Sequence, residues 1–175
     1  MAMTSGGTSQ GYHTVFVYGS LLADEVVKVL LNRIPASSPA ILPDYHRFNI
    51  KGRVYPAILP VENNKVLGRV LNGVSNLELD ILDIFEDVEY ARDSVEVTLV
   101  DTLEKKQAYA YVWDNKDDPD LYGEWDFENW KCTCMNDFIE MTKEFVEELE
   151  HSESKSRVET YKSFYQSTDD NSSMP

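Results

Sequence analysis

The segment Val15-Phe16-Val17-Tyr18-Gly19-Ser20-Leu21 decides which fold we expect for this chain. Its apolar and aromatic residues before Gly19 predict a β-strand, Gly19 allows the backbone to turn, and the run Asp24 to Arg33 predicts a helix. Such a strand–glycine–helix junction leaves backbone N–H groups unpaired beside the positive end of the helix dipole. The junction therefore suits a carboxylate or a developing oxyanion, although many α/β proteins turn on a glycine here for structural reasons alone.

Two common active-site motifs are missing from this junction. The turn contains neither G-x-x-x-x-G-K-[ST] nor G-x-G-x-x-G, so the sequence does not support a nucleotide-phosphate site. Ser20 lacks the flanking glycines of a G-x-S-x-G nucleophile elbow, and none of the histidines (His13, His46 and His151) has a context that suggests a partner base. We therefore expect Ser20 to position the backbone or form hydrogen bonds, not to act as a nucleophile.

The composition limits the partners of this protein. Its 175 residues, 42% of them hydrophobic, are enough for one globular domain. A net charge of −15 excludes nucleic acid and anionic membranes as partners, because both would repel an acidic protein. Small substrates that carry an amine or a positive charge remain compatible with it.

The sequence contains no targeting or metal-binding signal that we can identify. The segment 1–10 is polar, and no apolar run is long enough to span a membrane, so we expect a cytoplasmic protein. Cys132 and Cys134 are too close together for a good disulfide, and no His or Cys cluster completes a zinc site near them. We expect reduced cysteines, no metal and no cofactor.

The chain divides into three parts by composition. Residues 1–12 predict a flexible lead, residues 13–150 a folded domain, and residues 151–175 a polar, largely disordered tail. Inside the domain, the proline-rich stretch 36–61 predicts short edge strands and loops, and 65–71 predicts a strand broken by Gly68.

Periodicity predicts a hairpin and a terminal helix in the second half of the domain. The alternating segments 94–100 and 107–113, joined by a polar link, predict an antiparallel hairpin. Apolar residues at spacings of three or four predict an acidic amphipathic helix over 125–150. We expect Trp125, Phe127 and Trp130 to dock this helix against the domain.

Glu86 is an anomaly in the helix that the capping box Ser75-Asn76-Leu77-Glu78 predicts up to about Asp87. On a helical wheel the other acidic residues form a solvent face, whereas Glu86 falls between Leu79 and Leu82 at the edge of the apolar arc. A carboxylate held against apolar neighbours loses hydration, and this raises its pKa toward the range of a general base. The alternative is a frayed last turn from which Glu86 reaches water.

Three segments together resemble the gamma-glutamyl cyclotransferase family, and its plant avirulence-induced-gene-like branch in particular. They are Val15 to Leu21, Leu82 to Tyr90 with Arg92, and Gly123 to Phe127, in this order along the chain. The resemblance covers about residues 13–150. It implies an α+β fold, a small mixed β-barrel flanked by helices.

The resemblance also implies a site and a reaction. In the family an acidic residue of the Leu-Asp-x-x-Glu stretch is the general base, which corresponds to Glu86 here. The family's substrate-binding loop corresponds to Val15, Phe16, Val17, Tyr18, Gly19, Ser20 and Leu21. The implied reaction is cofactor-independent: the α-amine of a gamma-glutamyl group attacks its own γ-carbonyl, forming 5-oxoproline and expelling an amine or amino acid. Many relatives have Gly directly after the base, where this chain has Asp87.

Several neighbouring residues have open roles. Tyr90 and Arg92 could line the cleft or orient Glu86, or serve as a core aromatic and a surface ion-pair partner. Arg53 and Tyr55 could reach the same cleft. For Tyr109 and Tyr111 we favour core packing, since they share one face of a predicted strand.

We expect a monomer whose partner is a small gamma-glutamyl substrate, with no nucleic acid and no membrane bound. The alternative is a non-catalytic ligand-binding or defence-response protein that keeps the fold, and the defence role is implied only by the plant resemblance. An acidic interaction module over 124–150 is a weaker alternative, because the apolar spacing there fits docking within the chain better.

Overall fold

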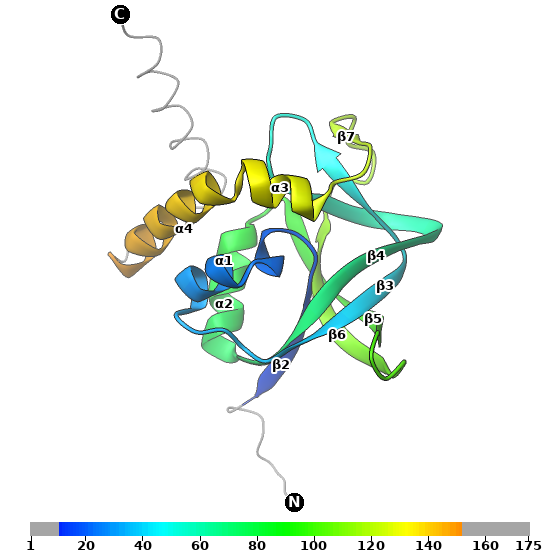
Figure 1. Cartoon of the computed structure of the whole chain (residues 1–175), viewed down its shortest axis with the longest axis horizontal. Coiled ribbons are helices and arrows are strands. Elements are labelled where there is room, and N and C mark those ends of the chain that lie inside the picture. Colours follow the sequence, from blue (N-terminus) through cyan, green and yellow to red (C-terminus); the bar gives the residue numbers. More distant parts are fainter. Residues whose placement is uncertain (1–10, 152–175) are drawn as a thin grey trace, which may run out of the picture.

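Six strands and four α-helices make up the part of the chain that the computed structural model describes, residues 11–151 (Figure 1). The strands are β2 (Tyr12–Val17), β3 (Ser37–Ile50), β4 (Ala57–Ser75), β5 (Tyr90–Leu99), β6 (Lys105–Trp113) and β7 (Leu121–Tyr122). The helices are the 3-10 turn η1 (Ser20–Leu22), α1 (Asp24–Leu31), α2 (Asn76–Glu86), α3 (Phe127–Thr133) and α4 (Met135–Glu150). The predicted lead and tail lie outside the described residues, apart from positions 11, 12 and 151.

The strands form a partly closed ring. The sheet order is β4-β2-β6-β5-β3-β7, and β3 also pairs with β4. Following the paired strands from β4 through β2, β6, β5 and β3 therefore leads back to β4. All pairings are antiparallel except that of β2 with β6, which makes the sheet mixed. Within residues 11–151, β2 and β6 share the single register pair Val15–Tyr109, and hydrogen bonds therefore close the ring only in part. The predicted α+β fold is confirmed, and its barrel character in part.

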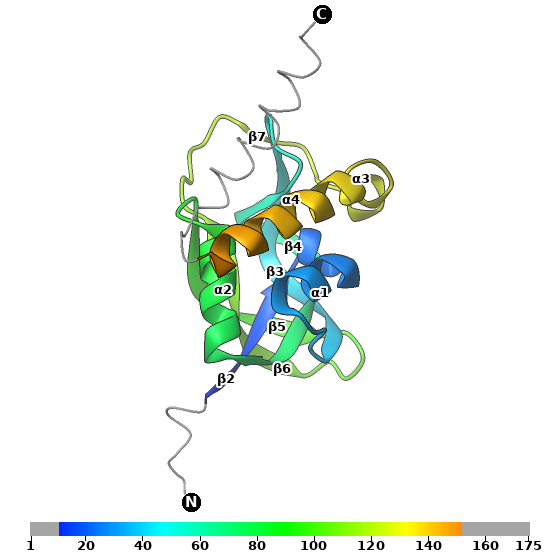
Figure 2. The ribbon, with the colours of Figure 1, turned by 90° about the vertical axis from the view of Figure 1, so that its left-hand side faces the viewer.

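Helices α1, α2 and α4 lie together on one side of this ring (Figures 1 and 2). Phe85, in the last turn of α2, contacts Phe138 and Phe145 of α4 edge-to-face, with ring centroids 6.2 and 5.3 Å apart. All three side chains are fully buried. This aromatic cluster fixes the end of α2, where Glu86 stands, against the C-terminal helix.

The predicted capping box at the start of α2 is confirmed. The Ser75 hydroxyl accepts the Glu78 N–H at 3.1 Å, and the Glu78 carboxylate accepts the Ser75 N–H at 3.0 Å. Arg33 donates two further bonds to Glu78, at 2.6 and 2.7 Å. These bonds hold the pKa of the Glu78 carboxyl below its ordinary value, with the Arg33 hydrogen bond as the largest cause.

The prediction for 36–61 is wrong. Instead of short edge strands, β3 runs for 14 residues and β4 for 19, and the two pair along most of their length. Pro43 is accommodated beside a register shift, where Asp44 takes a left-handed φ of 63°. Gly68 does not break β4: a Cβ there would lie 2.3 Å from the Val17 carbonyl oxygen, so glycine lets the end of β2 approach its sheet neighbour β4 closely.

The hairpin prediction is confirmed, because β5 and β6 pair antiparallel from Tyr90–Trp113 to Thr98–Lys105. The terminal helix differs from its prediction in one respect, since Cys134 separates α3 from α4. Both cysteines are free thiols.

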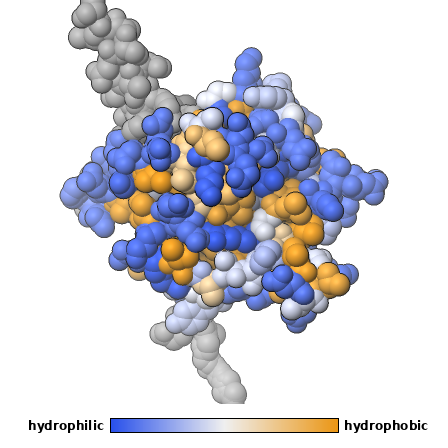
Figure 3. All heavy atoms as spheres, in the orientation of Figure 1, coloured by the Kyte–Doolittle hydropathy of each residue, from blue (hydrophilic) through white to orange (hydrophobic). Residues whose placement is uncertain are grey.

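No helix within residues 11–151 is long and apolar enough to cross a membrane. Figure 3 shows hydrophilic residues over much of one face, with apolar residues between them.

The capping network predicts a specific pH dependence. Because folding lowers the pKa of Glu78, its ionisation stabilises the fold above its ordinary pKa of 4.5, and this contribution is lost as the pH falls through the folded value. We expect Glu78→Gln to lower the free energy of unfolding at pH 7, and the difference from the parent to shrink below about pH 4.5. Urea titrations between pH 3 and 7 measure it, with the exposed Glu62→Gln as control. A difference independent of pH would contradict the assignment.

Candidate active site

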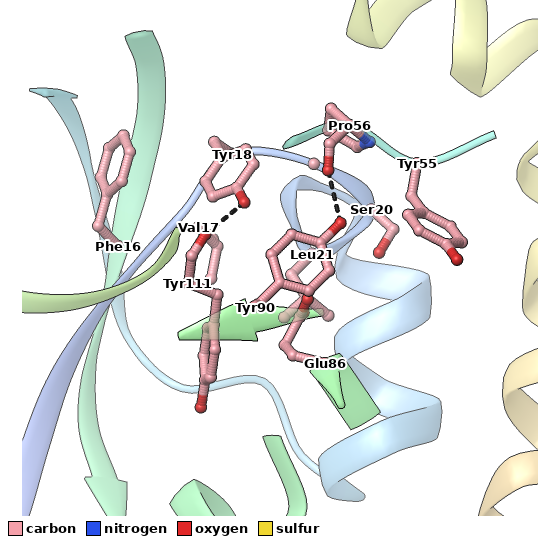
Figure 4. Close-up of a pocket in the computed structure, with 11 residues that line it drawn as sticks. Phe16, Val17, Tyr18, Ser20, Leu21, Tyr55, Pro56, Glu86, Tyr90 and Tyr111 are labelled. Atoms are coloured by element: carbon pink, nitrogen blue, oxygen red, sulfur yellow. Dashed lines mark hydrogen bonds between the residues drawn. The ribbon is translucent and has the colours of Figure 1, made fainter. Parts of the chain in front are cut away.

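A pocket lies where the end of β2, the segment before β4, the end of α2 and the ring strands meet (Figure 4). About 350 Å³ of space between these residues is not filled by protein atoms, and this volume includes open solvent. The lining residues are Phe16, Val17, Tyr18, Gly19, Ser20, Leu21, Tyr55, Pro56, Glu86, Tyr90 and Tyr111. The two segments singled out from the sequence, the Tyr18–Leu21 loop and Glu86, thus meet in one pocket.

Glycine is required at position 19 by close packing. A Cβ on Gly19 would lie 2.8 and 2.9 Å from the ring carbons of Pro56, so only a bare backbone allows Pro56 to form this wall. After Gly19 the chain makes the tight turn η1, in which Leu22 and Ala23 donate their N–H groups to the carbonyls of Gly19 and Ser20 at 2.9 and 3.1 Å. The first N–H groups of such a turn have no acceptor within it.

Glu86 is the carboxylate in the wall of this pocket. It is the last residue of α2 and is half-buried: its side chain is neither fully exposed to solvent nor fully enclosed in the hydrophobic core. Figure 4 shows it across the pocket from Tyr18 and Pro56. Its negative charge is among the causes that raise the pKa of Tyr111, which places it within electrostatic reach of that side chain.

Tyrosine side chains form the other walls. The Tyr18 hydroxyl donates to the Tyr111 carbonyl at 2.5 Å, and the Tyr90 hydroxyl donates to the Pro56 carbonyl at 2.7 Å (Figure 4). Each bond ties together segments that are distant in sequence. Tyr111 donates its own hydroxyl to Asp83 at 2.6 Å, and burial, then this bond, raises its pKa, so the phenol stays protonated.

Arg53 supports the pocket from behind Tyr55. It forms a paired salt bridge with Glu89 at 2.6 and 2.9 Å and donates to the Tyr55 hydroxyl. Its pKa is raised, mainly by the hydrogen bond to Glu89. Arg53 does not line the pocket itself, whereas the Tyr55 that it holds does.

Arg92 and Tyr109 lie outside the pocket. Arg92 forms a salt bridge with Asp83 at 2.8 Å, and its guanidinium stacks on the Tyr109 ring at 4.7 Å. Asp83, Asp87, Tyr90, Arg92 and Tyr111 line a second, open depression next to the first. Arg92 is thus placed as the ion-pair partner, while Tyr90 and Tyr111 are shared by both hollows.

The structure separates Val15 from the rest of the predicted loop. Val15 is fully buried, pairs with Leu71 in the sheet and is not among the pocket-lining residues. Conversely, Pro56 forms a wall that sequence reasoning did not single out. No group of three or more His, Cys, Asp or Glu side chains within residues 11–151 could hold a metal ion.

Asp87, directly after Glu86, has a backbone conformation that belongs to glycine. Its φ of 70° and ψ of −172° fall in a region that L-residues rarely occupy. The side chain compensates in part by accepting the Val88 N–H at 2.8 Å. A strained residue at this position turns the chain sharply out of α2 and leaves Glu86 at the pocket wall.

A family model described as Gamma-glutamyl cyclotransferase, AIG2-like matches residues 15–130. AIG2-like protein D of Arabidopsis thaliana is 62% identical over 138 residues, which cover 78% of this chain and 91% of that protein. Protein AIG2 B of the same plant is 46% identical over 157 residues, which cover 90% and 92%.

Solved structures agree with the family match. A solution structure from Arabidopsis thaliana is similar with a TM-score of 0.62 and 41% identity, covering 88% of this chain and 99% of that one. A crystal structure of an AIG2-like protein from Mus musculus has a TM-score of 0.53 and 21% identity, covering 66% and 88%. The second likeness concerns the fold alone.

The conformation of Asp87 predicts an unusual order of stability for two variants. Asp87→Ala and Asp87→Gly both remove the carboxylate, but only glycine relieves the strain. We expect Asp87→Gly to be more stable than Asp87→Ala by about 1 kcal/mol, after the greater entropy of glycine in the unfolded chain is subtracted. Urea unfolding of the two variants checks this. Equal stabilities would show that position 87 is not strained.

Proposed function

The chain belongs to the gamma-glutamyl cyclotransferase, AIG2-like family, and we propose that it converts gamma-glutamyl amino acids or amines to 5-oxoproline and a free amine. One observation carries the proposal: Glu86 lines the same small pocket as the Gly19–Leu21 backbone. A base and a set of main-chain donors are the two groups that this cyclisation requires.

Glu86 serves as the general base and then as the acid. The α-ammonium of the substrate cannot attack until it loses a proton, and the Glu86 carboxylate accepts that proton. The free amine then adds to the γ-carbonyl carbon and forms a five-membered ring with a tetrahedral oxyanion. The ring nitrogen of this intermediate still carries a second acidic proton. Glu86 returns the first proton to the departing nitrogen and then accepts this second one, while collapse of the intermediate breaks the original C–N bond. The second proton also passes to the departing amine, so that 5-oxoproline is formed and the amine leaves as the ammonium ion.

The loop supplies the charge stabilisation. Backbone N–H groups at Gly19, Ser20 and Leu21 are suited to the oxyanion of the tetrahedral intermediate, because they are fixed in the turn η1 before reaction begins. Nucleophile and electrophile belong to one molecule, so the pocket mainly has to hold the substrate in its folded, near-attack shape.

The aromatic walls favour ring closure over hydrolysis. Tyr18, Tyr90 and Tyr111 are buried, and the hydroxyls of all three are bound to acceptors of the protein. They therefore present mainly ring surface to the pocket, which limits water near the γ-carbonyl. The α-amine of the substrate is then the nucleophile in reach.

A non-catalytic binding protein is the alternative within the same family. It would keep the pocket and bind gamma-glutamyl compounds without releasing 5-oxoproline. A panel of gamma-glutamyl amino acids and amines, assayed both for binding and for 5-oxoproline release, distinguishes the two.

We expect Glu86→Gln to lower turnover by about 10²–10⁴-fold, because the amide cannot accept the proton. The fold should persist, since the side chain is half-buried and the substitution conserves its shape. Initial rates of 5-oxoproline release measure the loss, and circular dichroism checks the fold.

Glu144→Gln is the matched control. Glu144 is exposed on α4 and does not line the pocket, so this variant should keep the parental rate. Parental turnover in Glu86→Gln would remove Glu86 from the mechanism.

A further inference from the structure

Each carbonyl of the Tyr18–Leu21 loop is held by a donor of the protein. The carbonyls of Gly19 and Ser20 accept the N–H groups of the turn η1. The carbonyl of Tyr18 accepts from Arg47 at 2.7 Å, and that of Leu21 accepts from Arg69 at 2.8 Å. The two ends of the loop are therefore gripped by side chains from β3 and β4.

Both arginines are built into the protein at a cost. Their Nε atoms are buried and have no hydrogen-bond partner within the described residues. Burial lowers the pKa of Arg47 below its ordinary value, as expected for a cation withdrawn from water. Retaining two partly desolvated guanidinium groups next to one loop suggests a role beyond packing.

Other contacts fix the direction of each guanidinium. Arg47 also donates to the Leu67 carbonyl at 2.9 Å and stacks on the Trp125 ring at 5.4 Å. Arg69 forms a salt bridge with Asp24 at 2.7 Å, at the start of α1. Each side chain is thus held from a second side, so it can set the position of the carbonyl that it binds.

Peptide geometry then decides where the loop amides point. In a trans peptide the N–H lies opposite the C=O of the preceding residue. Since the carbonyls of Tyr18, Gly19 and Ser20 are engaged by the protein, the N–H groups of Gly19, Ser20 and Leu21 point away from those donors. These residues line the pocket, whereas neither arginine does.

We propose that Arg47 and Arg69 are positioning residues, an arginine clamp that orients and polarises the Gly19 and Ser20 amides for a developing oxyanion in the pocket. Arg47 acts on the Gly19 amide directly, through the Tyr18 carbonyl of the same peptide. Arg69 acts one peptide further away: it binds the Leu21 carbonyl, whose peptide carries the Leu22 N–H, and this N–H donates to the Gly19 carbonyl of the peptide that carries the Ser20 N–H. A cation bound to the carbonyl end of a peptide increases the partial positive charge at its N–H end. The catalytic part of this inference rests on the proposed function; the orientation of the loop does not.

Trp125 extends the clamp to the opposite wall. Its indole N–H donates to the Val54 carbonyl at 3.0 Å, two residues before Pro56, and its backbone N–H donates to the Arg47 carbonyl at 3.1 Å. One side chain therefore sets both Arg47 and the segment that carries Tyr55 and Pro56. Through these contacts Trp125 helps to set the distance between the Tyr18–Leu21 loop and the wall formed by Tyr55 and Pro56.

The kinetic test uses Arg47→Lys and Arg69→Lys, which keep the charge but lose the forked geometry. We expect each to lower kcat about tenfold or more, with KM changed less than about threefold, because the amides act mainly on the transition state. Arg33→Gln is the matched control: Arg33 also binds a carbonyl, that of Gly73 at 2.7 Å, and a carboxylate, but away from the pocket. It should lower the melting temperature and leave kcat at the parental value.

A second measurement does not require turnover. The backbone amide NMR signals of Gly19, Ser20 and Leu21 are followed in the parent, both lysine variants and Arg33→Gln, with and without 5-oxoproline. We expect the Gly19 signal to move in Arg47→Lys and the Ser20 signal to move in Arg69→Lys, with the Leu21 signal as an internal reference. We expect no such movement in Arg33→Gln, and the response of the displaced signals to 5-oxoproline should weaken.

Unmoved amide signals in Arg47→Lys and Arg69→Lys would overturn the clamp, as would moved signals with parental kcat. If the parent itself releases no 5-oxoproline, the proposed function fails, and the amide signals and their response to 5-oxoproline still decide whether the arginines orient the loop. Each lysine variant is a separate test, so failure of one to fold leaves the other decisive.

Discussion

The close approach of the end of β2 to its sheet neighbour β4 is the constraint on which the site depends. Gly68 leaves room for the Val17 carbonyl where any side chain would collide with it, so the two backbones approach directly. This approach brings the strand end that leads into the Tyr18–Leu21 loop next to Leu67 and Arg69 of β4. A side chain at position 68 would displace this strand end, and with it the loop carbonyls that the two arginines bind. The close approach also explains why a glycine in the middle of a long strand is tolerated despite its entropic cost.

The Glu86 carboxylate is placed by a different part of the structure. The Phe85 ring sits between Phe138 and Phe145, so α4, which follows the last strand, secures the final turn of α2. The amide side of the pocket is built from β2, β3 and β4, and the acid side from α2 and α4. The two halves are joined through Tyr18–Tyr111 and Tyr90–Pro56 hydrogen bonds that cross the pocket wall. The complete pocket therefore forms only when these strands and helices are folded together.

The sequence allowed the local features to be predicted and concealed the long-range ones. The strand before Gly19, the capping box at Ser75 and the hairpin of β5 and β6 each carry their signal within a few residues, and all three are present. Strands are expected within 36–61 and over 65–71, but the length and continuity of β3 and β4 are not, because prolines signal breaks unless a bulge such as that at Asp44 absorbs them. The arginine contacts had no signal at all: Arg47 lies 29 residues from Tyr18, and only the register of β3 with β4 brings them together. Glu86 stands out in the sequence because its polarity contradicts the pattern of its own helix and because the resemblance points to the same residue; the structure places it in the pocket wall.

The parallel contact of β2 with β6 has a consequence for the motions of the domain. One register pair joins these strands within the described residues, whereas β3 and β4 are paired over most of their length. The ring is therefore held at this seam chiefly by the burial of Val15 and Phe16, not by a ladder of backbone bonds. Local opening of a protein begins where the fewest buried contacts and backbone hydrogen bonds hold neighbouring elements together. Fluctuations that part β2 from β6 would open the ring at this seam while β2 stays paired with β4. The Tyr18–Tyr111 hydrogen bond spans this seam, so the pocket would lose its geometry before the remainder of the fold melts.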